Sequence, residues 1–397
     1  MMSFDIATGT LEAAATITWD AIVIGAGPAG APAARLLALG GLQTLAVDAK
    51  MFPRDKVCGG YVNERALTAL ERVGLLSRVL DCSTPVRQLE VVRGRQRLRV
   101  PLLRGRLTNR AAFDTTLLDA TASAGVTIIT GAQAVVQPAM AGDCRILSLT
   151  QESERVQVRA RVVICADGLA RSSVRLLPEF TTAVEPASRV GIGAIVASEA
   201  ADYEFGKITM VVSRRGYVGI ARTNQRELNV AAAIAPGELA KCGPAAAVAD
   251  ILRESALPEL AEISAATWRG TPPVTSKPKC LAGERIFLIG DASGYVEPFT
   301  GEGIAAAVES AIAVASLAIQ GVYTWNNSLA SRWAALHRQI VSDRQTTSRR
   351  LAWTLRRPWA AAIALTACQL HPRLAARIIA STGSPTQGVS LTHRGAV

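Results

Sequence analysis

Six residues near the start of the sequence form a glycine-rich motif, GAGPAG from Gly25 to Gly30, whose spacing suits the binding of a dinucleotide. In such a motif the first glycine allows a tight turn, the second lets the backbone approach a pyrophosphate, and the third lets a helix pack closely on a strand. The helix that follows offers unpaired N–H groups to the phosphates. Asp48 ends the next apolar run, where its carboxylate can accept hydrogen bonds from a ribose diol. We therefore predict that Gly25, Gly27, Pro28, Ala29, Gly30 and Asp48 bind a dinucleotide.

Two later segments resemble motifs of the flavoprotein aromatic hydroxylase superfamily, whose members are similar to p-hydroxybenzoate hydroxylase. Residues 163–175, which contain Asp167-Gly168, look like its Asp-Gly motif, and residues 285–292 look like its second FAD fingerprint. The resemblance implies that the dinucleotide is FAD and that Asp291 binds the ribityl chain of the flavin. Taken separately, Asp167-Gly168 is also compatible with an ordinary turn.

Within that superfamily, two further stretches resemble the FAD-dependent geranylgeranyl reductase family. These are FPRDKVCGG at residues 52–60 and GDASGYVEPFTGEGI at residues 290–304. The second is a glycine-rich loop that leads into a helix, so its backbone N–H groups suit negative charge on a reduced flavin ring. The resemblance implies cofactor-binding roles for Arg54, Cys58, Gly59, Asp167, Gly168, Pro298, Gly301, Gly303 and Ile304.

Arg110 and Cys58 are the side chains placed to act near a flavin. Arg110 resembles the superfamily's arginine beside the FAD, where a guanidinium suits a phosphate or a ring edge. A solvated charge at a helix start is the alternative. Cys58 lies between a basic segment and Gly59-Gly60, so its thiol could tune the ring or donate a proton to a reduced alkene. Cys58 is therefore our candidate catalytic residue, with a small packed side chain as the alternative.

The expected substrate sheet departs from the family pattern. Geranylgeranyl reductases carry Tyr-x-Trp-x-Phe-Pro there, whereas residues 216–222 read GYVGIAR, so that Tyr217 alone remains as a predicted substrate-binding residue. The missing Trp and Phe would have supplied large apolar surfaces around a polyprenyl chain. The segment also lacks the Trp-x-Trp-x-Ile-Pro pattern of flavin-dependent halogenases, which argues against halogenation.

The elements that must position these residues indicate an α/β fold. We expect a Rossmann-type FAD-binding domain, an inserted antiparallel β-sheet substrate domain and a helical C-terminus. The opening strand, helix and strand at residues 20–47 form one βαβ unit, and another helix is predicted from Thr108 to Ala124 with Asn109 as its N-cap. The expected domains are an extension at 1–18, the FAD-binding domain at 19–180 and 280–325, the substrate domain at 181–279, and a basic helical region at 326–397.

The charge balance favours anionic ligands. The 397 residues include 43 Lys and Arg against 32 Asp and Glu, a net charge of +11, which suits phosphate groups or an anionic membrane surface. Nucleic acid is not expected, because no nucleic-acid-binding motif is found. Arg349, Arg350, Arg356 and Arg357 lie close to Trp353 and Trp359, which indicates either peripheral membrane contact or a helix pair that caps the core.

Other site classes and locations are not supported by the sequence. His337, His371 and His393 show no ligand spacing, so we expect no metal site, and no Ser-His-Asp arrangement supports hydrolysis. The seven cysteines form no CxxC pair, which favours a reducing cytoplasm. No basic start precedes the first apolar residues, as a secretory signal would require, and no run of 18 apolar residues occurs.

These features predict an FAD-dependent oxidoreductase that acts on a small hydrophobic substrate between two domains. Electrons would come from transiently bound NADPH or NADH, or from a redox protein. The resemblance favours reduction of carbon–carbon double bonds. A monooxygenase of an aromatic or polyketide substrate and a non-redox flavin-dependent isomerase or cyclase are the alternatives.

Overall fold

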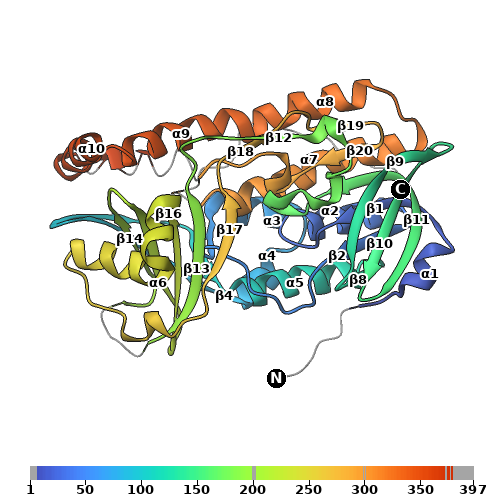
Figure 1. The fold of residues 1–397 in the computed structure, drawn as a ribbon. Coiled ribbons are helices and arrows are strands. Elements are labelled where there is room, and N and C mark those ends of the chain that lie inside the picture. The colour runs from blue at the N-terminus through green and yellow to red at the C-terminus, as the bar shows by residue number, and fades with distance from the viewer. Residues whose placement is uncertain are drawn as a thin grey trace.

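A parallel sheet forms the centre of the nucleotide-binding part in the computed structural model, which describes residues 7–198, 203–297, 299, 301–371, 373–375 and 377–378. Its strands run in the order β20-β11-β1-β2-β8, and β19 pairs antiparallel at the edge (Figure 1). Their bounds are β1 Thr18–Ile24, β2 Thr44–Asp48, β8 Thr127–Thr130, β11 Glu154–Cys165, β19 Ala282–Gly283 and β20 Ile286–Leu288. The predicted α/β class is confirmed.

The apolar side chains of β1 alternate between the two faces of this sheet, as the pleat requires. Val23 packs toward α2 (Gly30–Leu39) and α7 (Gly303–Tyr323), whereas Ile22 packs toward β9 (Gln133–Ala141) and β10 (Cys144–Gln151). The short helix α1 (Leu11–Ala15) joins the second group, and α5 (Arg110–Ala122) packs against α2.

A second, seven-stranded sheet has the order β17-β13-β16-β15-β14-β5-β6. It is antiparallel except where β14 runs parallel to β5. The strands are β5 Gln88–Arg93, β6 Gln96–Pro101, β13 Val190–Ala197, β14 Lys207–Val212, β15 Gly216–Asn224, β16 Glu227–Ile234 and β17 Arg269–Pro273. Two of its strands thus come from residues 88–101, which we had grouped with the nucleotide-binding part. The domain boundaries stay a prediction.

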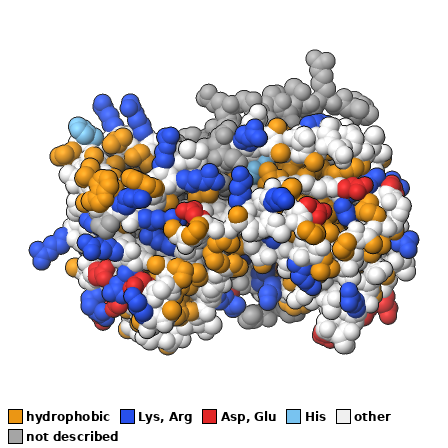
Figure 2. Space-filling view, turned by 45° about the horizontal axis from the view of Figure 1, so that its top comes forward, with side chains coloured by type: hydrophobic (Ala, Val, Ile, Leu, Met, Phe, Trp, Pro, Cys, Tyr) orange, Lys and Arg blue, Asp and Glu red, His pale blue; other side chains and the backbone are white. Residues whose placement is uncertain are grey.

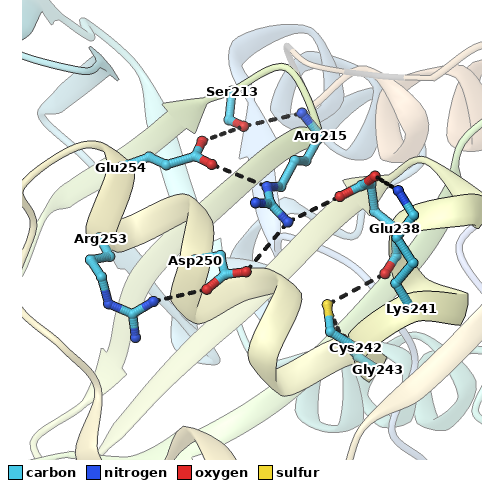
Figure 3. A network of polar contacts seen from close by, with 9 residues as sticks. All are labelled: Ser213, Arg215, Glu238, Lys241, Cys242, Gly243, Asp250, Arg253 and Glu254. Atoms are coloured by element: carbon cyan, nitrogen blue, oxygen red, sulfur yellow. Dashed lines mark hydrogen bonds and ion pairs between the residues drawn. The ribbon is translucent and has the colours of Figure 1, made fainter.

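Helices cover both faces of the second sheet. On one face, α6 (Pro236–Glu254) packs on the residues of β13, β15 and β16 that include Ile220 and Val230. Arg215, just before β15, fixes this helix, because its guanidinium pairs with Glu238, Asp250 and Glu254 (Figure 3). The opposite face carries Tyr217 and contacts Leu355 and Leu365 of the C-terminal helices.

The C-terminal helices lie in a row over both sheets (Figure 1). They are α8 (Ser328–His337), a π-helical turn (Arg338–Ser342), α9 (Asp343–Leu355) and α10 (Pro358–Leu370). The buried Trp333 of α8 donates a hydrogen bond to the carbonyl of Leu288 in β20 at 3.1 Å. The helical C-terminus is therefore confirmed within the described part of the chain.

Short elements complete the fold. A three-stranded sheet, a two-stranded sheet, two helices and several 3-10 turns connect the larger units. They are β3 Tyr61–Asn63, β4 Ser83–Pro85, β7 Gly105–Thr108, β12 Thr182–Val184, β18 Ser276–Pro278, α3 Glu64–Arg72, α4 Leu76–Asp81, and the 3-10 turns Gly168–Ala170, Ser172–Val174, Pro178–Phe180, Ala261–Ser264 and Gly290–Ser293.

Helix α7 is the one described helix long and apolar enough to cross a membrane by length and composition. Of its most apolar window, 67% is buried inside the molecule, and it packs against α2 and α3. This burial is what a core helix of a globular domain shows.

Candidate functional site

The three predicted loops meet at one edge of the parallel sheet. Ile24, Cys165 and Leu288 end neighbouring strands, because β11 pairs with both β1 and β20 in parallel register. The carboxyl ends of parallel strands share an edge, which is where such folds bind nucleotides. The loops that follow these strands contain the glycine-rich motif, Asp167-Gly168 and Asp291.

The backbones of these loops approach one another closely, which explains why glycines occupy the points of contact. A Cβ on Gly25 would lie 2.5 Å from the carbonyl oxygen of Ala166, and one on Gly30 would lie 1.7 Å from that of Gly25. A Cβ on Gly290 would lie 2.7 Å from the Cβ of Ala29. Gly25 and Gly290 also have φ angles of 93° and 58°. No side chain fits at these positions, so the geometry of the turn depends on glycine.

Gly27 differs from its neighbours, because a Cβ there would meet only the end of the Arg54 side chain, at 3.1 Å. The backbone at Gly27 is therefore open toward the loop edge, as a close pyrophosphate requires. The N-cap residues of α2 and α7, Ala29 and Glu302, make no side-chain capping bond, which leaves first-turn N–H groups for an anion.

A chain of alternating charges lies beside this opening. Asp48 Oδ2 accepts a hydrogen bond from the amide of Ala26 at 2.8 Å and lies 3.4 Å from the guanidinium of Arg54. Arg54 lies at the same distance from Asp114, which Arg110 binds through two hydrogen bonds of 2.9 and 2.8 Å. Burial lowers the pKa of Arg110, but Asp114 and the Cys58 thiol outweigh it, so its pKa is raised and its charge is fixed. Two cations, each paired with a carboxylate, thus lie close to the glycine-rich loop.

Asp167 and Asp291 are connected by an arginine that sequence reasoning missed. Arg171 donates hydrogen bonds to the carbonyls of Ala292 and Asp291 and to Ser276 Oγ, at 2.7, 3.1 and 3.1 Å. It thereby ties the loop after β11 to the loop after β20. Its φ of 47° is unusual for a residue with a side chain, a backbone feature that the sequence does not encode visibly.

Both carboxyl groups are held in an environment that disfavours their charge. Burial raises the pKa of Asp167, although hydrogen bonds from Ser173 and Ser172 oppose it, and the Oδ1 atom of Asp167 is buried without a partner. Burial also raises the pKa of Asp291, against the influence of Lys56, Arg110 and Arg171. An unpartnered buried acceptor suits a ligand hydroxyl or N–H group, so these residues fit a bound FAD.

The predicted segment from Phe52 to Gly60 crosses from these loops to the second sheet. Asn229 of β16 donates a hydrogen bond to the carbonyl of Cys58 at 2.9 Å, and Cys58 Sγ accepts one from the amide of Gly60 at 3.4 Å. Between the segment and β13 lies a cleft of about 400 Å³. Its lining includes Lys56, Cys58, Arg110, Asn229, Ala194 and Arg269. Cys58 and Arg110 therefore both line this cleft, while Cys58 also packs against the core cluster around α3 and α5.

Tyr217 is buried on another side of the loop before α7. Its ring packs edge-to-face on Phe299 with centroids 5.3 Å apart, and Arg189 lies 5.7 Å from its centroid. Burial raises the pKa of Tyr217 well above its usual value, an effect that Glu297 strengthens. Tyr217 does not line the cleft beside Cys58.

Tyr295 connects the two sides and was not singled out from the sequence. A Cβ on Gly303 would lie 3.5 Å from the Tyr295 ring. Burial raises the pKa of Tyr295, and Asp291, Cys58 and Tyr217 raise it further, which places the hydroxyl within the field of all three.

The other predicted cofactor-binding residues lie in different surroundings. Gly301 has a φ of 71°, and a Cβ there would lie 2.7 Å from the Tyr61 ring. Ile304 packs in the core with α3 and α5. Gly59 has open space around it, and the Lys56 ammonium lies 3.2 Å from the Cβ position of Gly168. Pro28 adjoins Gly27, and Pro298 lies outside the described residues, as does His393. No cluster of metal-ligating residues occurs in the described part of the chain.

Comparison with known proteins agrees with this geometry. Residues 18–324 match the FAD binding domain family. The chain is 28% identical over 358 residues to a menaquinone reductase of Mycolicibacterium smegmatis, with 85% of each chain covered. It is 27% identical over 333 residues to a digeranylgeranylglycerophospholipid reductase of Methanosarcina acetivorans, covering 78% of this chain and 77% of that one.

Solved structures show the same fold. The flavin-dependent brominase Bmp2 superposes with a TM-score of 0.77 at 18% identity, covering 92% of this chain and 94% of that one. Pseudomonas aeruginosa PqsL in complex with 2-aminobenzoylacetate superposes with a TM-score of 0.69 at 18% identity, covering 87% and 98%. With the family match over most of its length and the relatives named as reductases, the chain belongs to the FAD binding domain family and is an FAD-dependent oxidoreductase.

Proposed function

We propose that this enzyme reduces a carbon–carbon double bond of a hydrophobic, isoprenoid-type substrate with electrons from NADPH or NADH. The relatives named for menaquinone and for a digeranylgeranyl lipid support this choice, since both names denote lipids with unsaturated isoprenoid chains. The observation that carries it is the cleft beside Cys58, which joins the predicted flavin loops to an apolar stretch of β13.

The proposed reaction balances two electrons and two protons. FAD, when bound, accepts two electrons from the nicotinamide and delivers them to the alkene. One of the two new C–H bonds takes its hydrogen as a proton from an acid in the site. The residues proposed to hold the cofactor are Gly25, Gly27, Pro28, Ala29, Gly30, Asp48, Arg54, Cys58, Gly59, Arg110, Asp167, Gly168, Asp291, Pro298, Gly301, Gly303 and Ile304.

Cys58 is the proposed proton donor. Cys58 lines the cleft together with Arg110, and it is the one cysteine among the described lining residues. Cys58→Ser should slow alkene reduction far more than it slows reduction of the flavin by NAD(P)H, because the exchange removes the acid and keeps a small polar side chain. Cys242→Ser, at an exposed cysteine in α6, is the matched control. Unchanged turnover in Cys58→Ser would remove the catalytic role.

Cationic side chains in the same cleft support a transient nicotinamide site. Lys56, Arg110 and Arg269 line it, and a dinucleotide donor carries phosphates that such groups bind. A redox protein is the alternative donor. Tyr217, with Phe299 and the apolar side chains around it, is the proposed contact for the hydrophobic end of the substrate.

The deciding experiment combines flavin identification with anaerobic turnover. Purified protein would be mixed with NADPH or NADH and with polyprenyl acceptors, and the molecular masses of the products would be measured by mass spectrometry. The proposal expects FAD and a mass gain of two hydrogens per reduced bond. Incorporation of an oxygen atom in air, with no reduction anaerobically, would replace it with the monooxygenase alternative.

The monooxygenase alternative is retained for one specific reason. The substrate sheet lacks the Trp and Phe of the geranylgeranyl reductase pattern, as residues 216–222 show. An aromatic or polyketide substrate would need less apolar enclosure than a polyprenyl chain. If turnover requires reduced flavin but consumes no electrons, the result would favour the isomerase or cyclase alternative instead.

We further propose that the protein works in the cytoplasm, at the membrane surface. All seven cysteines are free, which suits a reducing compartment. Cell fractionation tests this location: recovery in the soluble fraction at low salt would remove the membrane part of the proposal.

A further inference from the structure

We propose that the outer face of α10, with the end of α9, is a docking surface for a lipid bilayer with anionic headgroups. This deepens the proposed membrane contact by naming the surface and its partner, and it is tested without any turnover of the enzyme.

Helix α10 is apolar on both of its sides. Its 13 residues contain no charged side chain. On the inner side Ala361, Leu365 and Cys368 are buried against the second sheet and β6. A surface helix of a globular protein ordinarily shows a polar outer face, whereas a helix apolar all round is covered by protein or by lipid.

The exposed apolar residues of α10 follow a single line. Trp359, Ile363 and Leu370 have exposed fractions of 62%, 63% and 72%. At 3.6 residues per turn, these positions fall within about 40° of one another around the helix axis. Leu374, beyond the end of α10, extends the line with 41% exposed. Thr366 is the polar residue exposed on the same side, and it accepts a hydrogen bond from Gln96, so the apolar residues form one ridge that this threonine interrupts.

Two tryptophans and an arginine form the start of this ridge. The rings of Trp353 and Trp359 pack edge-to-face with centroids 6.3 Å apart, and the Arg357 guanidinium lies 4.0 Å from the Trp353 ring centroid. Trp353 is nevertheless 49% exposed. Tryptophan beside arginine is typical of the membrane–water interface, where the ring is half apolar and the cation meets a headgroup.

The charge around the ridge selects an anionic partner. From Arg344 to the end of the sequence the chain contains eight arginines and no Asp or Glu. Of these, Arg349, Arg350, Arg373 and Arg377 are exposed. Figure 2 shows hydrophobic side chains gathered at the end of the molecule that α10 forms, with Lys and Arg side chains around them. A second copy of the chain would bring like charges together on this face, which disfavours it as the partner.

Vesicle binding by the full-length flavoprotein tests the proposal. Vesicles of phosphatidylcholine alone and of phosphatidylcholine with phosphatidylserine would be sedimented with the protein at low and high salt. We expect binding to the anionic vesicles that weakens with salt, and little binding to the neutral ones. Failure to sediment with anionic vesicles at low salt overturns the proposal.

Paired variants place the contact on this face. Arg373→Gln with Arg377→Gln should weaken binding roughly 20-fold, from about fivefold per cation at an anionic surface. Trp359→Ser with Ile363→Ser should weaken it at least tenfold. The matched controls are Arg72→Gln with Arg226→Gln, at exposed arginines elsewhere, and Leu39→Ser, at an exposed apolar residue of α2.

The outcomes are distinct. If the controls lose as much binding as the α10 pairs, attraction is general and the surface is wrong. If wild-type protein dimerises without lipid and Trp359→Ser with Ile363→Ser abolishes the dimer, the face joins two copies and the proposal is wrong. Flavin absorbance and the thermal midpoint of each variant report folding. A failed alkene assay would leave these results unaffected, so the two proposals can fail separately.

Discussion

At the scale of single residues, the site uses carboxylates in two opposite ways. Asp48 and Asp114 both lie 3.4 Å from the guanidinium of Arg54, and Asp48 also accepts a hydrogen bond from the amide of Ala26. Asp291 is instead half-buried in a place where desolvation raises its pKa, and no described residue donates a hydrogen bond to its side chain. The first pair maintains the fold of the loops, whereas Asp291 is poised for a ligand and costs stability without one.

Asp291→Ala should therefore separate binding from stability. In the wild-type apoprotein, Asp291 should contribute a loss of stability as pH rises above the ordinary carboxyl pKa, because the folded state raises the pKa of Asp291 and disfavours its charge. The variant should lack this loss and be no less stable at pH 7, yet its dissociation constant for FAD should rise about tenfold or more. Urea unfolding of apoprotein and flavin fluorescence measure the two effects. A variant that is less stable and binds FAD normally would contradict the assignment.

Asp114→Asn, unlike Asp291→Ala, should lower the free energy of unfolding. Asp114 is fully buried and holds Arg110 by two hydrogen bonds, so the variant leaves a buried guanidinium without its carboxylate and should lose about 3 kcal/mol of unfolding free energy. Asp119→Asn is the control, since Asp119 lies on the same helix and its pair with Arg78 is 60% exposed at the carboxylate. Its loss should stay below about 0.5 kcal/mol. Equal losses in both variants would show that burial of the pair is unimportant.

At the scale of elements, strands with long apolar runs and helices with clear ends were predictable from sequence. The helix predicted at Thr108 to Ala124 is α5, and Asn109 Oδ1 accepts a hydrogen bond from the amide of Ala111 as an N-cap should. The membership of β5 and β6 in the second sheet was not predicted. The strand β5 pairs with β14, which lies more than a hundred residues later in the sequence. No local pattern specifies a partner at that distance.

Helix α8 supports the loop after β20 through a histidine. His337 Nε2 lies 2.8 Å from Ser293 Oγ, and Ser293 donates to the carbonyl of Gly290, so His337 is the donor in this pair. Burial, with Lys277, lowers the pKa of His337 to about 4. The folded state therefore binds fewer protons than the unfolded state between pH 6.5 and 4.

The contribution of His337 to the stability of the wild-type protein should fall across that window as pH falls. His337 alone should cost up to about 3 kcal/mol by pH 4. His337→Gln should remove this part of the pH dependence while lowering stability at pH 7 through the altered hydrogen bond. Unfolding free energies of the two proteins at several pH values from 7 to 4 test it. Parallel curves would mean that His337 titrates normally.

At the scale of the whole molecule, the C-terminal helices connect the nucleotide-binding part to the second sheet. Arg356, at the end of α9, contacts the buried Glu297 at 3.0 Å, and Arg189 beside β13 contacts the same carboxylate at 2.8 Å. Glu297 directly precedes the loop that leads into α7. One carboxylate thus joins the helix row, the sheet and the flavin loop.

Arg356→Gln should weaken this connection. Glu297 would keep only Arg189 as a charged partner, so the unfolding free energy should fall by about 2 kcal/mol, and amides of α9 and α10 should exchange faster with deuterium. Arg253→Gln provides the comparison, because Arg253 is 61% exposed and pairs with Asp250 and Glu259 at the surface. Its effect should stay within about 0.5 kcal/mol. Unchanged exchange in α9 and α10 after Arg356→Gln would refute the connection.

The loop residues of the site could be predicted from the sequence, whereas the contacts between the loops and the cleft beside them could not. Gly25, Gly30 and Asp291 are recognisable because a turn or a fingerprint fixes their type at a given spacing. Arg171 and Tyr295 act through neighbours brought close only by folding, so their types alone carried no such signal. The cleft beside Cys58 likewise depends on contact between residues near 58 and residues beyond 190.

The contact between α8 and β20 has a consequence for synthesis on the ribosome. Chains emerge N-terminus first at roughly 5–20 residues per second, and early segments can fold before later ones exist. Here Trp333 and His337 complete the surroundings of Leu288 and Ser293, which follow the glycine-rich motif by more than 250 residues. The nascent chain therefore cannot complete these contacts until residues up to His337 have left the exit tunnel, so we expect flavin to bind only after they have emerged.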